Sequence, residues 1–511
     1  MSQGYLYLCA SIVNRISRRE TTQTCMLETQ RWQLFIDGKF VEAENEQTYE
    51  VKNPADGNRV GIVPNATGVD TRKAIAAAQA AFKLWSKVSA KERGQLLRKV
   101  QDVLSGRVSE IARLITLENG KPYEEAKKEV AFGIDYFGWF AEEARRTYGD
   151  IVPSPSTSRQ FWVTKQPIGV VAAITPWNFP ATMVTRKIAP ALAAGCTVVL
   201  KPAPNTPLTA LAIAAALRDA GIPPGVFNVI TTEQTEVVGE ELLTHPAVRK
   251  IAFTGSTRVG KQLMERAASQ LKRVSFELGG NAPLIVFDDA DIDSAVEAAV
   301  AIKFLRVGGQ SCICANRIFV QDTIADQFTT AFLERVNQLK VGQGFEPGMH
   351  IGPLINEKAL NKVSYLVEDA RERGAKVVMG GQRLTDGNFA NGYFYPPTVL
   401  LNVEDSMPIC REEIFGPVAP ILTFSTEEEV IERANHSQYG LASYLFTRNL
   451  VRILRLSDSL DYGLVGVNDV GGYTHEVPFG GFKESGIGRE GGRRGIEEYM
   501  EEKTIVINLN G

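Results

Sequence analysis

The sequence predicts an α/β protein with two doubly wound, Rossmann-like domains and a small β-strand arm, and three patterns support this prediction. First, short apolar runs alternate with helical stretches between residues 168 and 277. Second, a further alternating unit follows Asp288. Third, two strand-like segments, 161–166 and 503–510, have no partner nearby in the sequence. Repeated strand–helix alternation is typical of doubly wound sheets, whose ligands bind at the carboxyl ends of the strands.

The chain begins with an extension and a helical region. Residues 1–26 have no acid before Glu20 and contain three arginines, a composition found in transit peptides. An early start of translation is the alternative, because Met26 lies just before the first patterned sequence. From about 64 to 149 apolar residues recur every three or four positions, which predicts helices.

The next region contains five apolar runs that predict buried parallel strands. A helical stretch separates each run from the next, and in one of them Thr206 and Pro207 are expected at the N-cap and the first helical position. After Asp288 the pattern predicts a helix from Asp291, a loop with two cysteines, a strand and a second helix. The five runs are IGVVAAI (168–174), CTVVL (196–200), VFNVI (226–230), KIAFT (250–254) and RVSFE (273–277).

Composition limits the partners of the chain. Its 511 residues are 44% hydrophobic and 23% charged, with a net charge of −3. This balance gives no basic surface for nucleic acid or for an anionic membrane. The longest apolar run, 188–200, is shorter than the roughly 18 residues that a membrane span needs. Six cysteines in so long a chain indicate a reducing compartment rather than a disulfide framework, so we expect the cytoplasm, or mitochondria if the extension is a transit peptide.

Polar loops rich in glycine or proline follow the predicted strands, where functional loops are common. The segment from Gly255 to Gly260 opens a helix directly after a strand, an arrangement that can bind phosphate. Because Thr257 replaces the middle glycine of GxGxxG, an ordinary turn is an equal alternative. Lys201 lies at another strand tip. Glu277 closes a buried strand, where we expect its carboxylate to be desolvated and its pKa raised; a salt-bridged structural glutamate is the alternative.

Cys312 and Cys314 lie one residue apart in the loop GGQSCICANR. We predict no metal, because a zinc site needs about four ligands and the four histidines show no ligand spacing. A glycine-rich polar loop suits a thiolate nucleophile. With no histidine beside it, the base is expected to be a carboxylate, and Glu277 is the candidate.

Six motifs together resemble the NAD(P)-dependent aldehyde dehydrogenase superfamily, over a span from about Trp32 to Asn508. The segment VFDDADIDSAVEAAV and the two-cysteine loop are most similar to the succinate-semialdehyde dehydrogenase branch. The motifs are TPWNFP (175–180), FTGSTRVG (253–260), FELGGNAP (276–283), GQSC (309–312), EEIFGPV (412–418) and PFGGFKESGIGRE (478–490).

The resemblance implies a role for each matching residue. Cys312 would attack the aldehyde to form a thiohemiacetal, Asn178 would stabilise the oxyanion together with the Cys312 backbone N–H, and Glu277 would activate water to hydrolyse the thioester. Cys314 matches a companion cysteine that can form a reversible disulfide with the nucleophile. The cofactor contacts would be Thr175, Trp177, Asn178, Lys201, Pro202, Ala203, Pro204, Gly255, Ser256, Gly260, Leu278, Glu413 and Phe415.

The resemblance also implies the substrate contacts. Arg186 and Arg306 match two arginines that hold the distal carboxylate of a semialdehyde. The sequence departs from the branch in two places: one extra residue precedes Arg306, and Tyr473, with Thr474 beside it, stands where the branch has a small hydroxyl residue. We expect the bulky Tyr473 to change the pocket and therefore the length of the substrate that it accepts.

Cofactor choice departs from the commonest pattern as well. Strict NAD enzymes of the family usually carry a glutamate three residues after the lysine, but here Pro204 occupies that position. Proline neither accepts hydrogen bonds from the ribose nor repels a 2′-phosphate. We therefore expect NADP or NAD as the cofactor, with NADP favoured.

The predicted function is oxidation of an aldehyde to a carboxylate, most plausibly of succinate semialdehyde or a similar short semialdehyde. A broad aliphatic or hydroxy-aldehyde dehydrogenase is one alternative; a non-catalytic protein of the same fold is a remote one. The chain is expected to form a homodimer or homotetramer. The predicted division is an extension (1–29), a cofactor-binding domain (30–150 and 169–283), a catalytic domain (284–480) and an oligomerisation arm (151–168 and 481–511).

Overall fold

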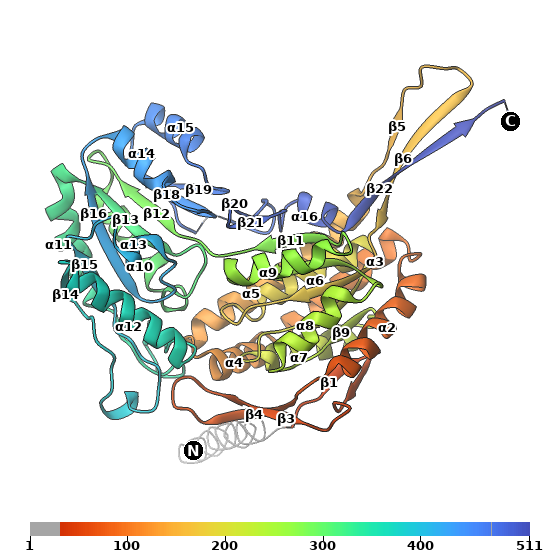
Figure 1. Cartoon of the computed structure of the whole chain (residues 1–511), viewed down its shortest axis with the longest axis horizontal. Helices are drawn as coiled ribbons and strands as arrows, with labels where there is room; N and C mark the ends of the chain where they lie inside the picture. The colour runs from red at the N-terminus through yellow and green to blue at the C-terminus, as the bar shows by residue number, and fades with distance from the viewer. Residues whose placement is uncertain (1–30, 472, 511) are drawn as a thin grey trace, which may run out of the picture.

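The computed structural model describes residues 31–471 and 473–510. The predicted extension at 1–29 therefore lies outside the described residues. Two sheets lie side by side, each covered by helices, and a narrow arm extends from one of them (Figure 1). The predicted α/β class with two doubly wound domains is confirmed. None of the helices in these two ranges is long and apolar enough to cross a bilayer.

The first sheet has a parallel centre that contains the five predicted strands. Its central order is β9-β8-β7-β10-β11. Successive strands of the chain are added outward on one side from β7 and on the other side from β10, so the strand order reverses between these two parallel strands. Ligands of doubly wound sheets bind at such a switch point. The strands in order are β2 (Lys39–Val41), β1 (Leu34–Ile36), β9 (Phe227–Val229), β8 (Thr197–Lys201), β7 (Val170–Ile174), β10 (Val248–Thr254), β11 (Arg273–Glu277) and β21 (Gly486–Ile487).

Helices cover both faces of this sheet because alternate strand residues point to opposite sides. Val171 and Ala173 of β7 pack in a core with α3 (Ala90–Ser105), α4 (Val108–Asn119), α5 (Tyr123–Glu143), α6 (Thr182–Ala194) and α7 (Pro207–Asp219). Val170 and Ala172 pack on the other face with α2 (Gly68–Trp85), α8 (Thr235–Thr244) and α9 (Thr257–Ala268). The central strands are therefore buried on both sides, as their continuous apolar runs predict.

The start of α7 shows how a distant side chain completes a local signal. Thr206 and Pro207 occupy the predicted N-cap and first helical position, but the Thr206 hydroxyl makes no capping bond. Instead the buried carboxylate of Glu118 accepts hydrogen bonds from the backbone N–H groups of Leu208 (2.8 Å) and Thr209 (2.9 Å). Burial raises the pKa of Glu118 to about 8.

The second sheet begins where the first ends. Residues 278–281 cross from β11 to β12, so one short loop connects the two sheets. Helix α10 (Ile292–Lys303) starts at Asp291, whose side chain accepts the Ser294 N–H, as predicted for this N-cap. The strands in order are β14 (Lys376–Met379), β15 (Thr398–Leu401), β16 (Val418–Phe424), β13 (Ala315–Gln321), β12 (Ala282–Val286), β18 (Ala442–Phe446) and β19 (Leu464–Val467).

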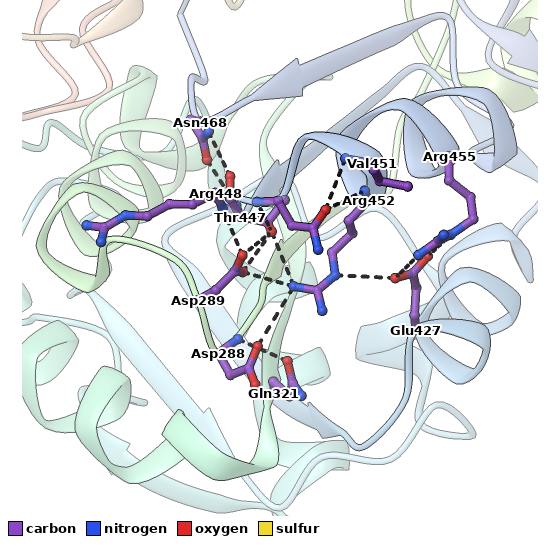
Figure 2. A network of polar contacts seen from close by, with 11 residues as sticks. Asp288, Asp289, Gln321, Glu427, Thr447, Arg448, Val451, Arg452, Arg455 and Asn468 are labelled. Atoms are coloured by element: carbon purple, nitrogen blue, oxygen red, sulfur yellow. Dashed lines mark hydrogen bonds and ion pairs between the residues drawn. The ribbon is translucent and has the colours of Figure 1, made fainter.

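A charged network holds the outer helices of the second domain on its sheet (Figure 2). Arg452 of α15 (Leu450–Ser459) contacts Asp289 at 2.9 Å and Glu427 of α14 (Glu427–Asn435) at 3.3 Å. Its guanidinium also lies 4.3 Å from the centre of the Phe287 ring. This network links the loop after β12 to both helices, so the sheet that supports the cysteine loop has a fixed outer layer.

The arm is a three-stranded antiparallel sheet that projects from the body (Figure 1). It consists of β5 (Asp150–Val152), β6 (Arg159–Pro167) and β22 (Met500–Asn508). The two predicted orphan strands pair with each other, with Thr504 opposite Val163. Residues before Met500 belong to the body instead of the arm, because β21 pairs with β11 and β20 (Phe482–Lys483) pairs with β17 (Tyr439–Gly440). The structural arm is therefore shorter than the predicted 481–511.

Candidate active site

The loops at the switch point of the first sheet face the cysteine loop of the second sheet across a cavity of about 430 Å³. The segments after β7, β10 and β11 supply one wall. Segments that precede β13 and β16 supply much of the other. The predicted site residues that line this cavity are Trp177, Asn178, Gly255, Ser256, Leu278, Cys312, Glu413 and Phe415.

A second cavity of about 1010 Å³ adjoins the first and shares Trp177, Gly255 and Ser256 with it. Among the predicted residues it adds Thr175, Lys201, Ala203 and Pro204. Pro202 and Gly260 line neither cavity. Gly260 has a packing role instead, because a Cβ there would lie 2.5 Å from a methyl group of Leu278.

The larger cavity is suited to an anion such as a dinucleotide phosphate. Ser256 caps the N-terminus of α9, whose free N–H groups favour negative charge. Lys201 is buried and forms no ion pair with the carboxylates of the described residues; burial lowers its pKa to about 8. A buried ammonium group without a counter-charge is costly, and a bound phosphate or ribose oxygen would relieve that cost. The residues present therefore fit a nicotinamide dinucleotide.

Cys312 is half-buried at the junction of the two domains. Burial, together with the charges of Glu413 and Glu277, raises the pKa of its thiol to about 12, whereas Arg186 and Arg306 act in the opposite direction. The connecting loop lies directly against this residue, since a Cβ on Gly280 would be 2.1 Å from the Cys312 carbonyl oxygen. Gly280 must therefore remain without a side chain for Cys312 to occupy this position.

Glu277 ends β11 with 3% of its surface exposed. Burial and the neighbouring Glu490 raise its pKa well above the ordinary value, in the predicted direction. Its Oε2 has no hydrogen-bond partner within the described residues. Glu277 lines neither cavity, but its charge raises the pKa of the Cys312 thiol. A buried carboxyl group with a free oxygen and a raised pKa is suited to accept a proton.

Asn178 is buried in the loop after β7. Its side-chain Nδ2 donates a hydrogen bond of 3.0 Å to the carbonyl oxygen of Gln310, two residues before the nucleophile candidate. The amide has a second N–H, which remains available to an oxyanion. This bond therefore ties Asn178 to the Cys312 loop across the domain boundary.

Arg186 is buried in α6 and its charge has a protein partner. Its Nε lies 2.9 Å from a carboxylate oxygen of Glu490, and the same carboxylate bonds to Lys187 at 2.6 Å. The guanidinium also stacks 4.1 Å from the ring of Phe479. Its Nη2 has no partner in the part of the chain that the structure describes, so one donor is free for a ligand.

Arg306 lies beyond the end of α10 and donates from Nη2 to the hydroxyl of Tyr473. The Tyr473 ring also packs against Phe479, 5.4 Å between centroids. Thr474 is exposed, and its hydroxyl is the main cause of the lowered pKa of Glu476. Val307, which directly follows Arg306, has a left-handed φ of 50°.

The thiol of Cys312 and the amide of Asn178 thus line one cavity, next to a larger cavity with a buried cation and a helix N-terminus. A family model described as "Aldehyde dehydrogenase family" matches residues 40–505. The chain belongs to this family. The predicted resemblance is confirmed, the chain is an oxidoreductase that acts on small aldehydes, and as a member of the family it uses NAD⁺ or NADP⁺.

Three known proteins place this aldehyde dehydrogenase among its relatives. It is 50% identical to "3-sulfolactaldehyde dehydrogenase" of Pseudomonas putida, covering 93% of this chain and 96% of that one. It is 49% identical to the NADP(+) succinate-semialdehyde dehydrogenase of Escherichia coli, covering 94% and 98%. The crystal structure of betaine aldehyde dehydrogenase from Staphylococcus aureus in complex with NAD⁺ superimposes with a TM-score of 0.92 at 38% identity, covering 94% and 95%.

Cys314 of the dehydrogenase is a free thiol, as is Cys312. It is buried, with its sulfur 3.9 Å from the Lys303 carbonyl oxygen. Burial raises the pKa of its thiol, while the Lys303 ammonium group counteracts this. The predicted disulfide between the two cysteines stays a prediction.

Sequence reasoning missed two residues of the site. Arg258 lines the larger cavity from the first turn of α9, and its position just after Gly255-Ser256 was a usable signal. Glu490 pairs with Arg186 and Lys187 from about three hundred residues away. Its only signal was its place in the motif PFGGFKESGIGRE, which carries no information on its partner.

The reactivity of the Cys312 thiol should depend on pH in a distinctive way. With the pKa raised to about 12, the thiolate fraction of the cofactor-free enzyme is small and grows tenfold per pH unit. The rate of alkylation by iodoacetamide should therefore rise from about pH 7 to pH 10 without levelling off, unlike that of an ordinary thiol of pKa about 8.5. Mass spectrometry of the peptide that contains Cys312 measures this rate. A plateau near pH 8 would contradict the raised pKa.

Proposed function

We propose that this aldehyde dehydrogenase oxidises a short aldehyde with an anionic group at its far end, and that succinate semialdehyde is the first candidate. The observation that carries the proposal is the pair of arginines beside the nucleophile. Arg186 lies 4.1 Å from the Phe479 ring and Arg306 lies 5.2 Å from the Tyr473 ring, and the positive charge of each lowers the pKa of the Cys312 thiol. Arg186 Nη2 and Arg306 Nε are buried donors without partners among the described residues, and buried donors that lack partners favour a ligand with acceptor oxygens.

The residues divide the reaction among them. Cys312 attacks the aldehyde carbon, and the free N–H of Asn178 together with the Cys312 backbone N–H stabilises the oxygen that becomes negative. When bound in the two cavities, NAD(P)⁺ would supply the hydride acceptor for this oxidation. Glu277 then removes a proton from the water that hydrolyses the thioester, a role suited to its buried and raised-pKa carboxyl group.

Tyr473 limits the length of the substrate. Its hydroxyl bonds to Arg306 and can donate its own proton to an anionic group held there. A phenol reaches further into the pocket than a small hydroxyl residue, so short substrates are favoured. A sulfonate-bearing hydroxy-aldehyde is the second candidate, because a guanidinium pair also binds sulfonate and a relative is named for 3-sulfolactaldehyde.

Arg306→Ala tests the substrate class. Loss of a charged hydrogen bond of about 1.5–3 kcal/mol should lower kcat/KM for succinate semialdehyde roughly 10- to 150-fold, mainly through KM. Steady-state rates with butanal provide the control, since a neutral aldehyde of similar length makes no such bond. An equal loss for both substrates would show that the arginine is structural. A screen of 3-sulfolactaldehyde in parallel separates the two candidate substrates.

Both cofactors are accepted and NADP is favoured. Lys201 and Pro204 both line the larger cavity, so a cation lies there and position 204 carries no carboxylate. Arg258 and Arg266 also line this cavity, as do Glu236, Glu240 and Glu265, and Glu240 is paired with Arg266. A 2′-phosphate gains from cations and is repelled by carboxylates. The named NADP⁺ relative and the NAD⁺ complex are compatible with either choice.

Pro204→Glu should shift the preference toward NAD⁺. A carboxylate at this position would repel the 2′-phosphate and accept hydrogen bonds from the ribose hydroxyl groups. The measured quantity is the ratio of kcat/KM for NADP⁺ to that for NAD⁺, which should fall at least tenfold. Pro204→Gln is the matched control, because it has the same size without the charge. An unchanged ratio would place the ribose elsewhere.

The arm joins the chain to a second copy in a homodimer or homotetramer. Its sheet has no helix on it in Figure 1, and Ile151 and Val506 are 79% and 59% exposed. Exposed apolar side chains on a projecting sheet favour burial against a partner. Sedimentation velocity should give an oligomer for the native chain and a smaller species for the Ile151→Lys, Val506→Lys double variant.

The four cysteines described as free thiols support a reducing compartment, and we place the protein in the cytoplasm. Under peroxide the reversible disulfide between Cys312 and Cys314 protects the nucleophile from irreversible oxidation. Peptide mass spectrometry tests this, because the disulfide removes two hydrogens from the peptide that contains both residues.

A further inference from the structure

The corner between α4 and α5 contacts both halves of the active site, although it lines neither cavity. Asn119 Nδ2 donates to the Trp177 carbonyl at 3.0 Å, and Lys121 Nζ donates to the Asn178 carbonyl at 2.8 Å. Both bonds reach the backbone of the loop after β7. The two carbonyl groups flank the α-carbon of Asn178. The bonds therefore fix the orientation of the backbone there, and with it the direction of the Asn178 side chain.

The carboxylate of Glu129 completes this arrangement. It pairs with Lys121, and the side chains of the two residues are 2% and 0% exposed. Its Oε1 accepts the backbone N–H groups of Ala181 (2.8 Å) and Thr182 (3.3 Å), which start α6. The corner therefore bonds to backbone from Trp177 to Thr182. A buried pair with every bond made rigidifies its surroundings, whereas removal of one partner leaves an unpaired charge.

A second contact reaches the other half of the site from the same helix. Glu125 lies one turn before Glu129 on α5, and its Oε1 accepts the Val307 backbone N–H at 2.8 Å. Val307 follows Arg306 directly and has a left-handed φ of 50°, a conformation that a β-branched residue holds only when its surroundings enforce it. The Glu125 bond is one such constraint.

We propose that the α4–α5 corner is a positioning device for the reaction: through Lys121 and Glu129 it orients the Asn178 amide, and through Glu125 it holds the segment that carries Arg306. The inference rests on the oxyanion and carboxylate roles given above. None of these corner residues touches the reacting atoms. Asn178 lies in the loop after β7 of the first sheet and Arg306 lies in the second domain. The corner bonds to the Asn178 carbonyl through Lys121 and to the residue after Arg306 through Glu125, so it keeps the two segments in register.

The first test uses a double-mutant cycle. Lys121→Met should lower kcat roughly 10- to 100-fold for every aldehyde, because a displacement of about 1 Å at the oxyanion suffices for such a loss. In the Asn178→Ala background the same change should cost less than about threefold, since the amide it orients is absent. Binding of NADPH, measured by fluorescence, should stay within about twofold of the native enzyme.

Lys127→Met is the matched control: this lysine lies on the outer side of α5, paired with exposed Glu124, and its loss should leave kcat unchanged. Asn119→Ala is the milder variant if Lys121→Met does not fold, and it should show the same dependence on Asn178. Equal losses in both backgrounds would overturn the positioning role. A native kcat in Asn178→Ala would contradict the oxyanion role of Asn178 and, with it, the positioning role of the corner. If Asn178→Ala is impaired but Lys121→Met is fully active, only the positioning role of the corner is contradicted.

The second test addresses Glu125. Glu125→Ala should raise KM for succinate semialdehyde several-fold and leave kcat/KM for butanal unchanged. Glu124→Ala, its exposed neighbour, should alter neither value. In the Arg306→Ala background the Glu125 change should have no further effect on KM. A rise in KM that persists without Arg306 would contradict the proposed link between Glu125 and the arginine.

Discussion

Cys312→Ala is expected to abolish aldehyde oxidation, with a loss of roughly 10⁴-fold or more, as for other enzymes that lose their nucleophile. Alanine cannot form the covalent bond to the aldehyde carbon from which the hydride leaves. The variant should still bind NADPH, because Cys312 lines the smaller cavity whereas the Lys201 side chain and Pro204 line the larger one. Absorbance at 340 nm measures the reaction, and fluorescence measures binding.

A second cysteine gives the control for this experiment. Cys410 is also buried, but it lies outside both cavities, and Cys410→Ser should keep most of its activity. Native turnover by Cys312→Ala would contradict covalent catalysis by this residue. Lost activity together with lost NADPH binding would indicate a collapse of the site and would not support the nucleophile assignment.

Glu277→Gln is expected to separate the two halves of the reaction. Formation of the thioester should proceed, since Cys312 and Asn178 are intact, but hydrolysis should slow by roughly 10²- to 10⁴-fold without the base. Stopped-flow absorbance at 340 nm should show a burst of about one NADPH per active site, followed by slow turnover, as expected when deacylation limits the rate. Loss of the burst would mean that Glu277 acts before hydride transfer.

The pH profile of the native enzyme provides an independent check on Glu277. A base must be deprotonated to act, and burial together with Glu490 raises the pKa of this carboxyl group. The rate of deacylation should therefore increase as the pH rises through the raised pKa, and level off above it. Glu277→Gln should lose this dependence. Glu413, whose pKa burial raises to about 7, remains in both proteins and so does not produce the difference.

The local patterns of the chain were sufficient for much of the fold. The five apolar runs correspond to β7 to β11, and the residues that follow them form the walls of the two cavities. This success has a simple cause, because a strand buried on both faces must be apolar throughout and the carboxyl ends of parallel strands meet at one edge. The predicted start of the C-terminal part of the arm, residue 481, was less accurate, because no local pattern showed that Gly486 pairs with β11.

The roles of the charged residues show the limit of this reasoning. Arg186 was predicted as a ligand for the substrate, and the structure adds that Glu490 already neutralises it. Arg306 is likewise engaged by Tyr473, a residue that the sequence marked only as a departure. In both cases the side chain was identified correctly as unusual, while its partner lay too far along the chain to be inferred from spacing.

Local patterns in the chain were enough to predict the α/β alternation, the resemblance to the family, and a thiol, a carboxyl group and an amide in the loops and strand ends of the site. The pairing of buried polar groups became visible only in the folded chain: Glu490 pairs with Arg186 and Lys187, Glu129 pairs with Lys121, and Glu118 binds the start of α7. The difference arises from the distance along the chain over which each property acts. Burial and periodicity are properties of neighbouring residues, whereas a buried carboxylate is stabilised by whichever donor the packing of helices and sheets brings to it, however distant that donor is in the chain.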